Sequence, residues 1–125
     1  MKSNVVREKS FGFAVKIVFV IKQIHEKKKE FVLSKQFLRS GTSIGANIRE
    51  SDNAESKADF IHKFSIAQKE CDETIYWLEL LNTTGYWEES DFTNLTNDAK
   101  ELLRIIRSIL LSSKQNIKLN STHNS

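Results

Sequence analysis

The sequence predicts an all-α protein, an antiparallel up-down-up-down four-helix bundle, and three observations lead to this class. The 125 residues include no proline and only four glycines, although proline makes up about 5% of an average chain. Hydrophobic residues make up 39% of the chain, which is enough for a packed core. Four long segments repeat apolar residues at steps of three and four, the period of an amphipathic helix. An all-β fold, which draws on turn-forming residues, is nearly excluded.

The first segment, about residues 5–28, carries more apolar surface than one seam of a bundle needs. Its two apolar series are Phe11, Val15, Val18, Ile21 and Phe13, Ile17, Val20, Ile24. The surplus face packs against another subunit, or the helix is central and covered on all sides by its own chain.

The second segment, about residues 31–53, places Gly41 and Gly45 four residues apart on one side. Each glycine costs about 1 kcal/mol relative to alanine in a helix interior. Close packing of a neighbouring helix would compensate that cost, and a kink in the helix is the alternative.

The third segment has recognisable ends. Ser56 fits an N-cap, and Asp59, three residues later, places a carboxylate in the first turn. Gly85 fits the C′ position that follows the last turn of a helix.

The fourth segment runs from about residue 88 to residue 113, and the sequence after it is polar and aperiodic. We therefore expect a bundle domain, residues 1–114, followed by a flexible polar tail, residues 115–125.

No set of residues predicts catalysis, a metal site or a cofactor. Cys71 lies on the apolar stripe of the third segment, and His62 lies on a different side of that helix. Asp59 and His62 form only one half of a di-metal motif. The segment from Gly41 to Gly45 lacks the lysine of a phosphate-binding loop. The protein is therefore expected not to be an enzyme.

Polar residues form a stripe along the second segment, beside its apolar side. They are Arg39, Ser43, Asn47 and Glu50. Glu70 and Glu73 of the third segment could meet this stripe. It is either a binding or catalytic groove, or a network or subunit interface that fixes the register of the helices.

The charges are segregated along the chain, although the net charge is only +3. Residues 1–35 hold nine basic and three acidic residues, residues 36–99 five and twelve, and residues 100–125 five and one. We therefore expect a basic face on two helices. Lys9 and Lys16 form it on the first segment, and on the fourth it consists of Lys100, Arg104, Arg107 and Lys114. These faces either neutralise RNA or DNA phosphates or are ordinary solvated surface.

The sequence also predicts a cytoplasmic location without membrane insertion. No signal peptide is recognisable, and the longest apolar run, residues 17–21, is too short to span a bilayer. Cys71 is the single cysteine, so no disulfide forms within one chain.

Two stretches of the chain resemble a known protein family. Residues 37–51 contain the pattern Arg-x-x-x-Ser-Ile-x-x-Asn-Ile, and residues 56–70 contain Ser-x-x-Asp-Phe. The chain resembles the bacterial four helix bundle proteins, first described as 23S ribosomal RNA intervening-sequence proteins. It departs from them at Arg49 and Ser51. The family resembles in fold the accessory variability protein of diversity-generating retroelements, a basic pentamer that binds nucleic acid and a reverse transcriptase. The resemblance implies a homopentamer around a channel.

We therefore expect a non-enzymatic oligomeric module that contacts RNA or DNA. The alternative is a protein-binding adaptor without nucleic-acid binding, anchored by Tyr76, Trp77 and Trp87.

Overall fold

The computed structural model describes residues 2–124, with side chains for residues 4–117. Its four helices are α1 (Lys2–Lys28), α2 (Leu33–Ser51), α3 (Lys57–Thr83) and α4 (Glu89–Asn124). No strand occurs within residues 2–124, so the predicted all-α class is confirmed.

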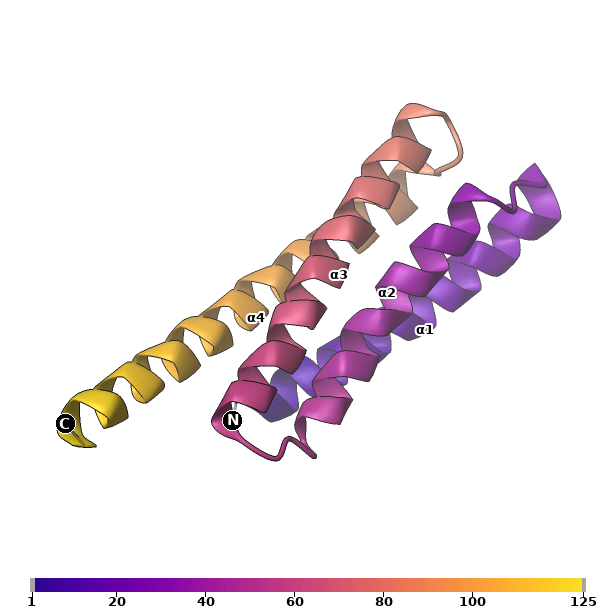
Figure 1. Ribbon diagram of the computed structural model, residues 1–125. Helices are drawn as coiled ribbons and strands as arrows, with labels where there is room; N and C mark the ends of the chain where they lie inside the picture. Colours follow the sequence, from indigo (N-terminus) through magenta and orange to yellow (C-terminus); the bar gives the residue numbers. More distant parts are fainter. Residues whose placement is uncertain (1, 125) are drawn as a thin grey trace.

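The helices pack side by side as a bundle. Each helix contacts the next along the chain, and α1 also contacts α4, which closes the arrangement. The α1–α2 and α3–α4 connections lie at one end of the molecule, and the α2–α3 connection lies at the other (Figure 1). All four helices contribute to the buried core, which includes Phe13, Phe37, Phe64 and Leu102.

Close packing of α1 against α2 depends on the two glycines. A Cβ atom added to Gly41 would overlap the Cδ1 atom of Ile17, whose side chain is fully buried. A Cβ added to Gly45 would lie 3.4 Å from the carbonyl carbon and oxygen of Ser10 on α1. Because α2 continues unbroken through both glycines, the structure supports the close-packing interpretation and not the kink.

The start of α3 is confirmed in atomic detail. The Ser56 hydroxyl accepts the backbone N–H of Asp59 at 3.0 Å, as an N-cap side chain does. The Asp59 carboxylate accepts the backbone N–H of Glu55 at 3.2 Å, which stabilises the turn that precedes the helix.

The end of α3 is also as predicted. Gly85 has a φ of 85°, the left-handed conformation that glycine adopts at little cost. The N–H of Tyr86 donates to the carbonyl of Leu81 at 2.9 Å, and the N–H of Gly85 donates to that of Asn82 at 3.1 Å. These two bonds form a Schellman motif, which satisfies carbonyls that the last turn would otherwise leave unpaired.

The start of α2 depends on a residue that the sequence placed in the connection. The Glu30 carboxylate accepts the backbone N–H groups of Val32 at 3.0 Å, Leu33 at 2.8 Å and Ser34 at 2.7 Å. Burial alone raises the pKa of Glu30, but the N–H groups of Leu33 and Ser34 outweigh it and hold that pKa below its usual range. Glu30 therefore supplies the capping interaction that the N-cap residue, Val32, cannot make.

Replacing Glu30 by glutamine should lower the free energy of unfolding by about 1 kcal/mol at neutral pH, because the helix N-terminus loses its carboxylate. Since the folded-state pKa is depressed, the carboxylate stabilises the protein above its unfolded-state pKa. That stabilisation is lost as the pH falls through the folded-state value. Urea unfolding at about pH 7 and about pH 3 should therefore show a smaller difference between the two proteins in acid. Glu26→Gln, at an exposed position of α1, is the control and should change little at either pH.

The predicted end of the fourth helix is wrong. We expected the helix to stop near residue 113 and residues 115–125 to form a polar tail, but α4 continues to Asn124. Neither glycine nor proline occurs after Gly85, so nothing in the sequence breaks the helix. The apolar pattern ends earlier because α4 extends beyond the other helices there (Figure 1). The flexibility of this segment stays a prediction, and residue 125 lies outside the described residues.

Within residues 2–124, no helix combines the length and the apolar character needed to cross a membrane.

Candidate nucleic-acid interface and subunit contact

Exposed cationic side chains follow one side of α4 and form what we call the α4 basic stripe. Its members are Lys100, Arg104, Arg107 and Lys114. Their steps of four, three and seven keep them on one side of a helix. Arg107 lies 3.8 Å from the Asp72 carboxylate of α3. Among the side chains that the structure describes, the other three have no ion-pair partner, so their charges face solvent.

The predicted basic residues of α1 are placed differently. Lys9 pairs with Glu101 of α4 at 2.5 Å, and Lys16 pairs with Asp98 at 2.7 Å. The hydrogen bond and charge of Lys9 lower the pKa of Glu101, so this carboxyl stays ionised beside the lysine. These lysines join α1 to α4, and the structure does not group them with the α4 basic stripe as free cations.

The polar stripe of α2 meets α3 at two of its members, Arg39 and Glu50, at separate places along the helix. Arg39 pairs with Glu70 at 3.2 Å and also forms an ion pair with Glu73. The indole N–H of Trp77 donates to the same Glu73 carboxylate at 3.1 Å. This part of the predicted network is present, and it connects α2 with α3.

The other members of the stripe make separate contacts. The Ser43 hydroxyl donates to the carbonyl of Arg39 at 2.6 Å, and the Asn47 amide donates to that of Ser43 at 2.9 Å. Glu50 pairs with Lys63 at 3.1 Å. Both local bonds run to the helix's own backbone, so the stripe does not converge on a single groove.

Sequence reasoning missed a buried polar contact between the same two helices. The Thr74 hydroxyl lies 3.0 Å from the Ser40 hydroxyl, and both side chains are fully buried. Such a hydrogen bond fixes how α2 and α3 align. The only signal in the sequence was that Thr74 is a polar residue on the apolar stripe of the third segment, three residues after Cys71.

Cys71 has no catalytic environment. Its side chain is fully buried, and its thiol donates to the carbonyl of Ala99 at 3.3 Å. Burial and the charge of Asp72 raise the pKa of the thiol to about 12, although Arg107 lowers it. A thiol in this environment stays protonated and is a poor nucleophile. Within the described part of the chain, no three side chains form a candidate metal site.

Large apolar side chains are exposed along the side of α1 that faces away from the bundle. Phe11 is 58% exposed, Phe19 60%, and Val15 and Val18 are each 38% exposed. Phe13, Ile17, Ile21 and Ile24 are buried instead. The predicted surplus apolar face is therefore confirmed, and within this chain it is uncovered.

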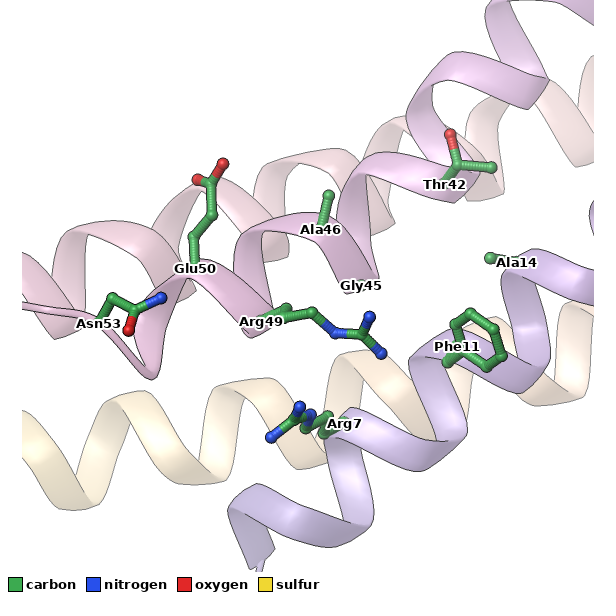
Figure 2. Close-up of a pocket in the computed structure, with 9 residues that line it drawn as sticks. All are labelled: Arg7, Phe11, Ala14, Thr42, Gly45, Ala46, Arg49, Glu50 and Asn53. Atoms are coloured by element: carbon green, nitrogen blue, oxygen red, sulfur yellow. The ribbon is translucent and has the colours of Figure 1, made fainter.

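A groove of about 440 Å³ lies between α1 and α2, next to this exposed face. Figure 2 shows Arg7, Phe11 and Arg49 around it. The Arg49 guanidinium lies 5.5 Å from the centre of the Phe11 ring, and Arg7 pairs with Asp52 at 2.9 Å. From the sequence, Arg49 was noted only as a departure from a family pattern. Its contact with Phe11 could not be predicted, because the spacing of residues along α2 does not show that α1 passes beside it.

The aromatic residues proposed as protein anchors are mostly engaged within the chain. Trp87 packs edge-on against Phe37, with ring centres 5.5 Å apart, and its indole N–H donates to the carbonyl of Leu78 at 3.0 Å. Trp77 is bonded to Glu73. Tyr76 packs edge-on against Trp77, with ring centres 5.0 Å apart, but at 55% exposure it is the most accessible of the three.

The fold and these surfaces define a small all-α protein of four packed helices. The chain belongs to the 23S rRNA-intervening sequence protein family, whose model matches residues 2–108. It is similar to a crystal structure of a protein with unknown function from the S23 ribosomal protein family of Bacteroides thetaiotaomicron. The two sequences are 54% identical, the TM-score is 0.86, and the match covers 88% of this chain and 98% of the other. No curated protein matches the sequence. The resemblance inferred from residues 37–51 and 56–70 is thus confirmed.

Proposed function

We propose that this chain is a non-enzymatic binding module of the cytoplasm, an antiparallel up-down-up-down bundle that contacts RNA or DNA. The observation that carries the proposal is the α4 basic stripe, where Lys100, Arg104 and Lys114 are exposed and form no ion pair within 4 Å among the described side chains. Lysine and arginine side chains at helical spacing can neutralise successive phosphates without reading bases.

Binding should be measured with structured RNA, single-stranded DNA and double-stranded DNA at about 50 mM salt, where phosphate contacts are strongest. Affinity that falls steeply with salt supports the proposal, and no detectable binding to any of the three contradicts it. A protein partner that is retained at high salt and after nuclease treatment would instead favour the adaptor alternative, to which Tyr76 is the available anchor.

We also propose that the chain forms a homo-oligomer, because the exposed face of α1 places four large apolar side chains in water. Monomeric proteins rarely expose large contiguous apolar patches unless these bind another molecule. The resemblance implies five subunits, which would repeat the α4 basic stripe and strengthen contacts with a long polyanion.

Light scattering coupled to size exclusion should therefore give a mass well above the 14.4 kDa of one chain. A mass five times that of one chain would support the pentamer. Another whole multiple would support self-association with a different number of subunits. A monomer at micromolar concentration would contradict self-association, and it would leave the nucleic-acid proposal to be decided by its own binding assay.

A further inference from the structure

α4 continues as a helix beyond the part that packs in the bundle. Ser113 is the last buried residue among the described side chains of α4, and residues 114–117 are all exposed, yet the helix runs to Asn124. We call residues 114–124 the α4 extension. At 1.5 Å per residue it adds about 16 Å of helix. Figure 1 shows this end of α4 projecting past the other three helices.

The last part of the chain carries positive charge without negative charge. After Glu101 the sequence contains neither aspartate nor glutamate, and its charged residues are Arg104, Arg107, Lys114 and Lys118. The α4 basic stripe therefore leads directly into the α4 extension. The family model ends at residue 108, so the family match does not account for this segment. An anionic partner is the one that its charge fits.

We propose that the α4 extension enters the major groove of double-stranded DNA, while the α4 basic stripe contacts the phosphates beside that groove. The inference rests on the proposed nucleic-acid binding and names which nucleic acid is bound, and how.

The dimensions of the protein select the α4 extension as the part that enters. A helix with its side chains is about 10–12 Å across, and the major groove of B-form DNA is about 12 Å wide and about 8.5 Å deep. Two packed helices, with axes about 8–10 Å apart, are too wide for it. The end of a single helix that projects from the bundle does fit (Figure 1).

The side chains on the outer side of α4 suit both bases and phosphates. Lys114 and Gln115 lie three and four residues after Leu111, so the three share one side of the helix, and all are exposed. A glutamine amide can pair with the edge of adenine, and an apolar side chain can contact the thymine methyl group. Arg104 and Arg107 lie one to two turns earlier, where the helix would leave the groove, and can contact phosphates there.

An RNA duplex offers the same phosphates but not the same groove. The major groove of A-form RNA is deep and narrow, and side chains cannot read it. Because the charge per nucleotide is the same, the α4 basic stripe alone would bind both duplexes with similar affinity. Preference for the DNA duplex therefore reports entry into the groove, which phosphate contacts alone do not require.

A comparison of nucleic acids of one sequence tests the proposal. Fluorescence anisotropy at about 100 mM salt should show that the DNA duplex binds about tenfold more tightly than the RNA duplex, and more tightly than single-stranded DNA. Two cationic dyes then locate the groove. Methyl green, which occupies the major groove, should displace the protein, whereas netropsin, which occupies the minor groove, should not.

A proline substitution tests whether the helix itself is needed. Asn116 is exposed and lies beyond the last buried residue, so Asn116→Pro should break the α4 extension and leave the bundle intact. The net charge is unchanged. Affinity for the DNA duplex should fall to within about twofold of that for the RNA duplex, and affinity for the RNA duplex should hardly change. Asn116→Ala, which keeps the helix, is the matched control and should keep the preference for DNA.

Urea unfolding followed by circular dichroism checks that both variants have the stability of the original protein. Equal affinity for the two duplexes, tighter binding of RNA or of a single strand, or an Asn116→Pro variant that keeps the preference for DNA would overturn groove entry. Binding through the α4 basic stripe would then still stand. The absence of binding to every nucleic acid tested would overturn both.

A preference for the DNA duplex that methyl green abolishes, and that is lost in Asn116→Pro but kept in Asn116→Ala, establishes that the α4 extension binds in the major groove.

Discussion

Replacing Lys100, Arg104 and Lys114 together by glutamate should lower the affinity for RNA or DNA about 100-fold at low salt. These three members of the α4 basic stripe are exposed and form no ion pair within 4 Å among the described side chains. Each therefore can displace a condensed counterion from a phosphate. The slope of log K against log salt concentration should flatten by about 2.7 per bound chain, or about 0.9 for each phosphate that the variant no longer neutralises.

The matched control changes the net charge by the same amount elsewhere. Lys28, Lys35 and Lys69 are exposed, lie outside α4, and have no ion-pair partner among the described side chains. Replacing these three lysines by glutamate should leave most of the affinity for RNA or DNA, and the slope of log K against log salt concentration should hardly change. If both triple variants lose binding equally, the net charge and not the α4 basic stripe is responsible. Fluorescence anisotropy over a salt series measures both quantities.

The parts of this fold that sequence predicts are those that depend on residues close together in the chain. The ends of α3 follow from Ser56 and from Gly85, whose capping bonds form within a few residues. The exposed apolar side chains of α1 follow in the same way, because helical spacing alone shows that one bundle seam cannot cover both of its series. The predicted end of α4 was wrong because the apolar residues stop recurring at helical spacing where α4 stops packing against the other helices. The helix itself continues beyond that point.

The parts that sequence could not supply depend on how one helix slides and turns against another. Spacing placed Glu50 on the same stripe as Arg39, but only the register of α2 on α3 decides that Glu50 meets Lys63 while Arg39 meets Glu73. Likewise, a count of charges along the chain makes Lys16 a free cation. The packing of α1 on α4 brings Asp98 within 2.7 Å of it and neutralises it. The candidate interface therefore becomes smaller than the sequence suggested, and it lies on α4.

Replacing Gly45 by leucine should lower the free energy of unfolding by about 1–3 kcal/mol. The first added carbon would already lie 3.2 Å from the Ser10 hydroxyl and 3.4 Å from the Ser10 carbonyl. Two of these contacts are to the backbone of α1, which cannot rotate away as a side chain can. Leucine is the better helix former by about 1 kcal/mol, so any loss of stability measures the forced separation of α1 from α2.

Ala46→Leu is the matched control, because it adds a side chain at the next residue of α2, where the position is exposed. It should change the free energy of unfolding by no more than about 0.5 kcal/mol. Urea unfolding followed by circular dichroism measures both variants. Equal stability of the two would mean that α2 can move away from Ser10 without loss. Glycine at position 45 would then be unnecessary for packing, and its cost within the helix would need another explanation.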